Sequence, residues 1–161
     1  MRYRLLGPLE VCDGDRPVRL GEGRQRNVLI LLLLHRNEAM GRDRLIDALW
    51  GESPPATAAK VLQNYIGQLR RALDDREGLR LQTRDRGYAI RVMDGELDLD
   101  RFDRLVREGR EALERERPAD AASWLREALG LWHGPALADV AYEPFAQPEI
   151  ARLEEQRAVA L

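Results

Sequence analysis

The sequence predicts an α+β unit over residues 1–95 and an all-α unit over residues 96–161. Strand-like segments, three helix-like segments and a hairpin follow one another up to about residue 95, whereas only helical periodicity follows. The charge changes sign at the same point: residues 1–95 carry 17 basic and 13 acidic side chains, a net +4, and residues 96–161 carry 9 and 15, a net −6. A basic unit joined to an acidic one indicates two modules with different partners.

The α+β unit is expected to begin with two short strands. The segments YRLLGPLEV and VRL are rich in aliphatic residues, and the turn residues of DGDRP separate them. Cys12, the only cysteine, falls in this region, so the chain can form neither an intrachain disulfide nor a thiolate metal cluster. We expect Cys12 to serve as a small apolar residue on a strand.

Three helices are expected next. RQRNVLILLLLHRNE is apolar through its middle and is closed by Asn37 and Gly41, which predicts a buried helix. GRDRLIDALWG has apolar residues at helical spacing and predicts a second helix that ends at Gly51. After the stiff loop ESPPA, Thr57 stands near the N-cap of a third helix that runs to about Leu73.

A hairpin is expected to close this unit. Apolar residues alternate with polar ones on both sides of the turn Asp85–Arg86–Gly87, namely Leu79, Leu81, Tyr88, Ile90 and Val92. Strands, three helices and a hairpin with a basic tip follow one another in the order of a winged helix-turn-helix.

The acidic unit is expected to be helical throughout. Helical patterns in LDRFDRLVREGREALERE and ADAASWLREALGLW are broken at Pro118, and a turn at HGPAL precedes a final helix near residues 148–161. Two antiparallel helices of this length are typical of tetratricopeptide units. Trp124 and Trp132 are expected to pack in their core. No capping residue ends the last helix, so we expect the natural protein to continue and this helical domain to be partial.

The third helix has two contrasting faces. At 100° per residue, an apolar stripe of Leu62, Ile66, Leu69 and Leu73 marks the core side. The opposite face has no acid, and its amides, cations and guanidinium are groups able to read base edges and bind phosphate: Thr57, Lys60, Asn64, Gly67, Gln68 and Arg71. Gly67, at its centre, costs the helix about 1 kcal/mol relative to alanine, but it lets another backbone approach closely. This pattern favours a DNA-recognition face over the alternative, an ordinary solvated helix surface.

Neighbouring segments support the same interpretation. The helix at 42–50 precedes the third helix by a short turn, as the first helix of a helix-turn-helix precedes its reader. Arg84 and Arg86 at the hairpin tip are placed where a wing would touch a minor groove. Arg24 and Arg26, at the start of the first long helix, could anchor phosphates or could equally be solvated.

The sequence offers no support for catalysis. Its serines, Ser53 and Ser123, and its histidines, His35 and His133, lie in different predicted elements and form no triad or metal motif. GEG at 21–23 lacks the length and the lysine of a phosphate loop. We therefore expect no enzyme activity, cofactor or metal. The longest apolar run has seven residues, and no signal-peptide pattern is present, so we expect a cytoplasmic protein with no membrane segment.

Several of these segments, taken in order, resemble one bacterial family. RQRNVLILLLL, RDRLIDALWGESPPATA, LQNYIGQLRRAL and the GYAI of the wing, followed by LDLDRF and LREALGLWHGPALADV, are similar to the Streptomyces antibiotic regulatory proteins. The resemblance covers essentially the whole chain. It implies an OmpR-like winged-helix DNA-binding domain over 1–95 and the first part of a bacterial transcriptional activation domain, with tetratricopeptide-like helices, over 96–161.

The resemblance also implies partners. A side-by-side pair would bind direct repeats in double-stranded DNA overlapping a promoter's −35 region and would recruit RNA polymerase, as activators of secondary-metabolite genes do. The helix 57–73 would read the major groove, and the hairpin 79–92 would be the wing. The loop 51–56 would contact the polymerase through Glu52, Ser53, Pro54 and Pro55. Related chains often have a serine or a basic residue where this one has Gly67 and Gln68, so the operator sequence does not follow from the resemblance.

These observations assign roles to the residues. Lys60 and Arg71 are expected to contact phosphate or guanine, and Asn64 and Gln68 to read bases. Arg84 and Arg86 are expected to grip the neighbouring minor groove or backbone. The alternative is a helical-repeat adaptor whose winged helix binds protein rather than DNA, because fold does not fix function.

Overall fold

The computed structural model describes residues 1–161 and divides into two compact units. The winged unit is Arg16–Met93, and the helical unit combines Met1–Asp15 with Asp94–Leu161. The predicted domains divided the chain at residue 95, which is close to the point where the chain leaves the winged unit. The structure differs at the N-terminus, because residues 1–15 pack with the helical unit. The division of the chain into a DNA-binding domain at 1–95 and an activation domain at 96–161 stays a prediction.

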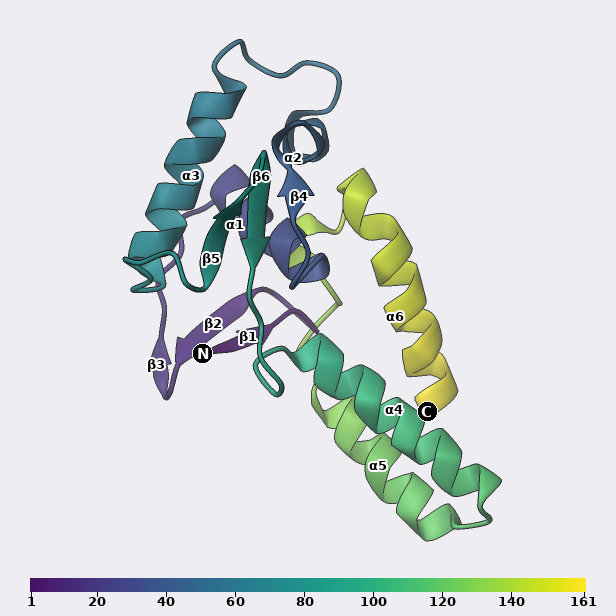
Figure 1. Ribbon diagram of the computed structural model, residues 1–161. Helices are drawn as coiled ribbons and strands as arrows, with labels where there is room; N and C mark the ends of the chain where they lie inside the picture. Colours follow the sequence, from purple (N-terminus) through teal and green to yellow (C-terminus); the bar gives the residue numbers. More distant parts are fainter. The chain divides into compact units, whose positions relative to one another are not determined.

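The winged unit contains the predicted sequence of helices and hairpin (Figure 1). Its elements are β3 (Arg16–Pro17), α1 (Arg24–Leu34), β4 (Met40–Gly41), α2 (Arg42–Trp50), α3 (Ala58–Ala72), β5 (Leu81–Arg84) and β6 (Gly87–Ile90). The last strands form an antiparallel sheet in the order β4-β6-β5, with Leu81 opposite Ile90 and Met40 opposite Tyr88. The sequence analysis did not predict β4, whose two residues are too few to show a strand period.

The core of the winged unit is built around α1. Six consecutive residues, Val28–Leu33, are buried, so this helix is apolar on every side. It packs against α2, α3 and β6. α2 ends at Gly51, which has φ 65°, a left-handed conformation that glycine adopts without strain. The predicted buried helix and its successor are confirmed.

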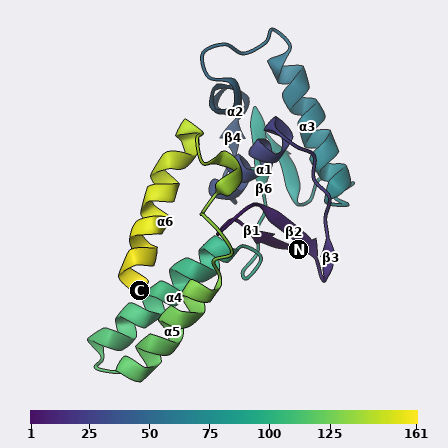
Figure 2. The ribbon, with the colours of Figure 1, turned by 180° about the vertical axis from the view of Figure 1, so that it is seen from behind.

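The helical unit is dominated by an antiparallel pair, α4 (Asp98–Glu114) and α5 (Pro118–Gly130), which lie side by side in both ribbon views (Figures 1 and 2). Pro118 occupies the first position of α5, where its missing N–H leaves no hydrogen bond unmade. Two 3-10 turns, Ala138–Val140 and Pro144–Ala146, lead into α6 (Gln147–Ala160). The predicted break at Pro118 and the predicted final helix are confirmed.

Close packing joins the antiparallel pair. A Cβ atom added at Gly109 of α4 would lie 2.6 Å from Leu125 Cδ2 on α5, so the two helices approach more closely than a side chain would allow. Trp132 makes an edge-to-face contact with Phe102, with ring centroids 5.5 Å apart, as expected for the core. Trp124 is different: it is 39% exposed and lies at the surface of α5, so its predicted place in the core is wrong.

The first of the two predicted strands, YRLLGPLEV, is replaced by two shorter strands. The second, VRL, is wrong: residues 18–20 lie outside any strand, and β3 falls at Arg16–Pro17 instead. β1 (Arg2–Arg4) and β2 (Glu10–Asp13) pair antiparallel, with Tyr3 opposite Val11. Gly7 and Pro8 lie between them and interrupt the predicted continuous strand. The partly exposed Cys12 lies on β2, as expected of a strand residue.

The loop between β1 and β2 is buried, and the helical unit supplies its polar partners. Leu5 and Leu6 are 0% exposed, and their backbone N–H groups donate to the carboxylate of Asp98 at 2.8 and 3.0 Å. The N–H of Leu9 donates to Asp139 at 2.5 Å. Burial without such partners would cost about 1–3 kcal/mol for each group, so the carboxylates are part of the reason why this loop can be interior.

No helix in the structure combines the length and the apolar character needed to cross a bilayer. No three His, Cys, Asp or Glu side chains gather as ligands for a metal ion.

Candidate nucleic-acid interface

The rotation of α3 is fixed by its apolar side. Leu62, Ile66 and Leu69 are at most 1% exposed, and α3 packs on α1 and α2. This is the stripe that the helical period predicted. Because the stripe is locked into the core, the opposite side of α3 must face outward.

That outward side forms one wall of a groove whose other wall is the wing, the β5–β6 hairpin. The groove has a volume of about 490 Å³. Five of the six predicted recognition residues line it, with three further residues of α3 and two of the wing: Lys60, Asn64, Gly67, Gln68 and Arg71, then Gln63, Ile66 and Arg70, then Thr83 and Tyr88. The structure thus brings the predicted face of α3 and the wing together in one concave surface. We call it the α3–wing groove.

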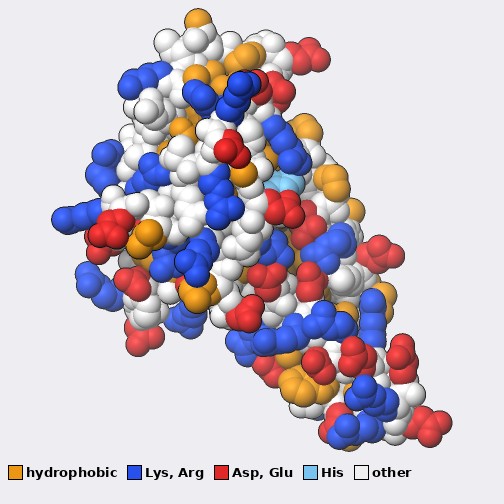
Figure 3. All heavy atoms as spheres, viewed as in Figure 1, with side chains coloured by type: hydrophobic (Ala, Val, Ile, Leu, Met, Phe, Trp, Pro, Cys, Tyr) orange, Lys and Arg blue, Asp and Glu red, His pale blue; other side chains and the backbone are white.

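The charge of the α3–wing groove has one sign. Lys60, Arg70 and Arg71 line it, and no acidic side chain does. Figure 3 shows many Lys and Arg side chains over the region of α3 and the wing, with fewer acidic side chains among them, whereas basic and acidic side chains are closely mixed along the α4–α5 pair. Cations at the rim of a groove lined by amides suit a polyanion with readable edges.

Gly67 has no packing role that would explain it. A Cβ atom added there would meet no atom within 4 Å, and its backbone is not in the left-handed region. The glycine is therefore required neither by a neighbour in the fold nor by its own backbone conformation. Because Gly67 has no side chain, the space beside it in the α3–wing groove is open.

Arg70 ties α3 to the wing. Its Nε donates to the carbonyl oxygen of Leu81 at 2.9 Å, and its Nη2 donates to Thr83 Oγ1 at 2.9 Å. Both acceptors belong to β5, so the width of the groove is set by hydrogen bonds rather than by apolar contact alone. The sequence analysis did not identify Arg70, because its partners lie beyond a loop and no local pattern reveals them.

The tip of the wing carries the two predicted arginines, Arg84 and Arg86, and both are exposed. Arg84 Nε donates to Gln82 Oε1 at 2.9 Å, which holds its side chain along β5. Gly87 follows the tip at a close approach: a Cβ atom there would run into the backbone carbonyl of Met40 on β4. Leu79, which the alternating pattern included in the hairpin, precedes β5 and is 63% exposed, so the first strand begins two residues later than predicted, at Leu81.

Arg24 and Arg26 lie at the start of α1 and are not among the residues that line the α3–wing groove. Arg24 donates from Nε to the carbonyl oxygen of Leu49 at 3.2 Å, and its guanidinium carbon lies 5.5 Å from the ring centroid of Trp50. Trp50 in turn stacks on Tyr65, with centroids 6.4 Å apart. Arg24 thus has a structural role that the sequence did not indicate. Arg26 is partly buried in the first turn.

The loop between α2 and α3 is exposed from residue 51 to residue 57. It includes the predicted polymerase-contact residues Glu52, Ser53, Pro54 and Pro55. Thr57 occupies the N-cap position of α3 as expected, but its side chain makes no capping hydrogen bond. It is also absent from the lining of the α3–wing groove, unlike the other residues of its face.

Sequence reasoning missed four polar groups of the groove: Gln63, Arg70, Thr83 and Tyr88. Gln63 was within reach, because it is polar and adjoins the recognition face on the helix surface. Thr83 and Tyr88 face each other in the hairpin register. Only the packing of β5 beside α3 brings them to the groove, and alternation within the hairpin cannot show that packing.

Comparison with known proteins agrees with this architecture. Residues 15–90 match the family described as "Transcriptional regulatory protein, C terminal", and residues 97–161 match "Bacterial transcriptional activator domain". Regulatory protein AfsR of Streptomyces griseus is 35% identical over 98% of this chain and 16% of its own length. Regulatory protein DnrI of Streptomyces peucetius is 36% identical over 98% of this chain and 61% of its own length.

A solved structure shows the same fold. Mycobacterium tuberculosis EmbR, in complex with a low-affinity phosphopeptide, superposes with a TM-score of 0.93 and 34% identity over 99% of this chain and 43% of that one. The chain therefore spans only part of the length of these relatives. The two family matches occur in the order that the sequence motifs predicted and together cover most of the chain. With a transcriptional-regulator winged helix followed by a bacterial transcriptional activator domain, the chain belongs to the Streptomyces antibiotic regulatory protein family of transcriptional regulators, not to a family of enzymes.

Proposed function

We propose that this chain is a sequence-specific DNA-binding transcriptional activator that inserts α3 into a major groove. The observation that supports this most directly is the α3–wing groove itself. Its lining combines three cations with amide side chains and contains no acid. Such a surface binds phosphates through charge and reads base edges through amides and guanidinium.

Each predicted contact has a place in this proposal. Asn64 and Gln68 read bases from the middle of α3, Lys60 and Arg71 bind phosphate or guanine, and Gly67 lets the helix approach the floor of the groove. Arg84 and Arg86 at the wing tip grip the adjacent minor groove or backbone. Thr57, Arg24 and Arg26 lie outside the groove lining and are peripheral contacts.

Family resemblance supports the regulatory part of the proposal. Two copies bind direct repeats side by side near a promoter's −35 region, and the exposed α2–α3 loop, with Glu52, Ser53, Pro54 and Pro55, meets RNA polymerase. The target genes belong to a secondary-metabolite cluster, and the protein works in the cytoplasm, where bacterial promoters are.

Footprinting on the adjacent promoter tests the binding mode. Protection of two direct repeats is expected, with an affinity that falls steeply as salt rises because phosphate contacts release counterions. Arg71→Ala should abolish specific protection, whereas Arg110→Ala, which removes an equal charge from an exposed position on α4, should leave it intact. Retained protection with Arg71→Ala would count against DNA recognition and favour the protein-binding adaptor.

Gly67→Leu tests the placement of α3. Leucine has a better helix propensity than glycine by about 1 kcal/mol or a little less, and a Cβ atom at this position meets no atom within 4 Å in the isolated fold. We therefore expect a raised melting temperature and a loss of operator affinity. Gly67→Ala is the matched control, with similar stabilisation and a smaller loss of affinity. Normal operator binding by Gly67→Leu would show that α3 is rotated differently against the DNA.

A further inference from the structure

A second hollow adjoins the α3–wing groove on the flank of β5. It has a volume of about 470 Å³, and Arg70 and Thr83 line both surfaces. Three arginines, Arg70, Arg76 and Arg84, contribute to its lining, against one acidic side chain, Glu77. We call it the flank hollow. None of the predicted DNA contacts except Arg84 belongs to it.

The loop that builds the flank hollow is held in place by one buried carboxylate. Asp75, three residues after the end of α3, is 8% exposed and accepts hydrogen bonds of 2.7–3.1 Å from the N–H groups of Leu79, Arg80 and Leu81. Its own N–H donates to the carbonyl oxygen of Arg70 at 2.8 Å. The segment between α3 and β5 is therefore a fixed turn, and the residues that it presents have defined positions.

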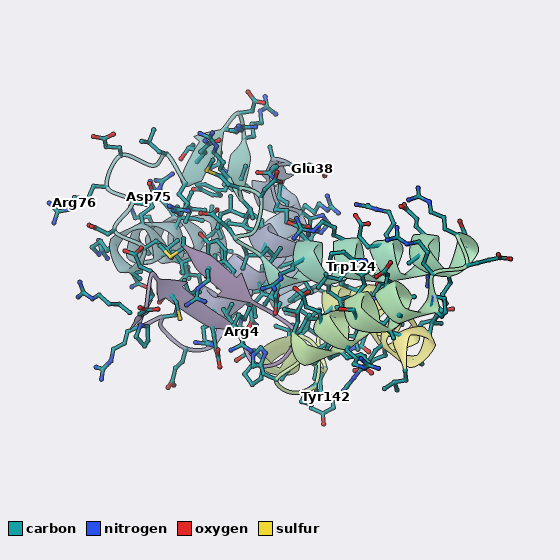
Figure 4. The ribbon with its side chains drawn as sticks, turned by 90° about the horizontal axis from the view of Figure 1, so that it is seen from below. Arg4, Glu38, Asp75, Arg76, Trp124 and Tyr142 are labelled. Carbon is teal, nitrogen blue, oxygen red and sulfur yellow. The ribbon has the colours of Figure 1, made fainter.

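Arg76 projects from this turn. Its side chain is 90% exposed, and Figure 4 shows it pointing away from the protein, next to Asp75. It forms a long ion pair with Asp74, with 3.7 Å between Arg76 Nε and Asp74 Oδ1. A pair exposed to this degree contributes little to stability, so the guanidinium can exchange Asp74 for another anion at little cost.

Arg70 and Arg84 are more firmly held. Hydrogen bonds from Arg70 to Leu81 and Thr83, and from Arg84 to Gln82, fix their side chains along β5. The flank hollow thus has two cations held by hydrogen bonds, Arg70 and Arg84, and one highly exposed cation, Arg76. It continues the positive charge of the α3–wing groove past the wing, because Arg70 belongs to both.

We propose that the flank hollow binds a backbone phosphate of the DNA, outside the base pairs that α3 reads, with Arg76 as the residue that closes on it. This inference rests on the proposed DNA-binding function. A polyanion seated in the α3–wing groove that continues past the wing meets the next cluster of cations at the flank hollow. The contact reads no base, so it lengthens the footprint and raises affinity without altering sequence preference.

The test uses Arg76→Ala in the full chain and two duplexes that carry one repeat. One duplex extends about one helical turn, roughly ten base pairs, beyond the footprint on the wing side, and the other ends at the wing. On the long duplex we expect affinity to fall about 5- to 10-fold near 0.1 M salt, and the slope of log affinity against log salt to decrease by about 0.9, as for one lost phosphate contact. On the short duplex we expect no change.

Controls separate this proposal from the proposed function. Arg76→Lys keeps the charge and should restore most of the slope, and Arg110→Ala should match the parent on both duplexes. An equal loss on both duplexes, or no loss on either while Arg71→Ala fails to bind, would overturn the flank contact alone. Normal binding by both Arg71→Ala and Arg76→Ala would instead overturn DNA recognition by the α3–wing groove, and the flank contact with it.

Discussion

Asp98 shows how one side chain can serve a distant segment. Its carboxylate accepts from the N–H groups of Leu5 and Leu6, more than ninety residues earlier in the chain. Burial raises the pKa of this carboxyl above its ordinary value of 3.8, although the two hydrogen bonds and the nearby charges of His133 and Arg4 pull it down. The folded protein therefore holds this proton to a higher pH than the unfolded chain does.

A pH dependence follows from that shift. Stability from the protonated form is fully present below the unfolded pKa and is lost as pH rises through the raised folded pKa. We expect the free energy of unfolding of the parent, minus that of Asp98→Asn, to fall with rising pH across this window and to be flat above it. Denaturant titrations at a series of pH values measure it. A difference that rises with pH would mean that the two hydrogen bonds outweigh burial.

At the scale of elements, the hairpin depends on a missing side chain. Gly87 of β6 pairs with Gly41 of β4, and a Cβ atom at Gly87 would collide with the backbone of Met40. We expect Gly87→Ala to destabilise the winged unit by more than about 2 kcal/mol, in the upper range for single substitutions, since backbone must move. Gly41→Ala is the matched control, because a Cβ atom there meets nothing within 4 Å. Thermal melting of both variants tests this, and similar melting temperatures would show that β4 can shift freely.

The same elements show what local sequence can predict. The two faces of α3 follow from its helical period, since both the buried stripe and the outward residues repeat with the turn of the helix. β4 and the position of Trp124 do not follow: β4 exists only because β6 lies beside it, and Trp124 has apolar spacing on a helix that presents that side to solvent. The roles of Arg70 and Asp75 could not be predicted either. The acceptors of Arg70 and the donors to Asp75 lie in or next to β5, beyond the loop that follows α3.

At the scale of the whole molecule, the winged unit is inserted into the sequence of the helical unit. A fragment of residues 16–93 contains its own core, from α1 to the β4-β6-β5 sheet, and we expect it to fold alone and to retain DNA binding with reduced affinity.

A fragment of residues 94–161 lacks β1, β2 and the loop that Asp98 and Asp139 hold. We expect it to be markedly less stable than the same segment joined to residues 1–15. Circular dichroism melts of the three fragments would decide this, and equal stability with and without residues 1–15 would contradict it.

The buried loop between β1 and β2 also affects the order in which the two units fold during synthesis. The N–H of Leu9 finds its acceptor in Asp139, 130 residues later. At about 5–20 residues per second, the ribosome releases that acceptor on the order of ten seconds after the loop has emerged. During this delay the winged unit can complete its own core, while the apolar side chains of Leu5, Leu6 and Leu9 remain exposed to solvent. A nascent chain stalled before residue 139 should therefore carry a folded winged unit behind an unfolded leading segment, the part of the chain most open to chaperones and proteases.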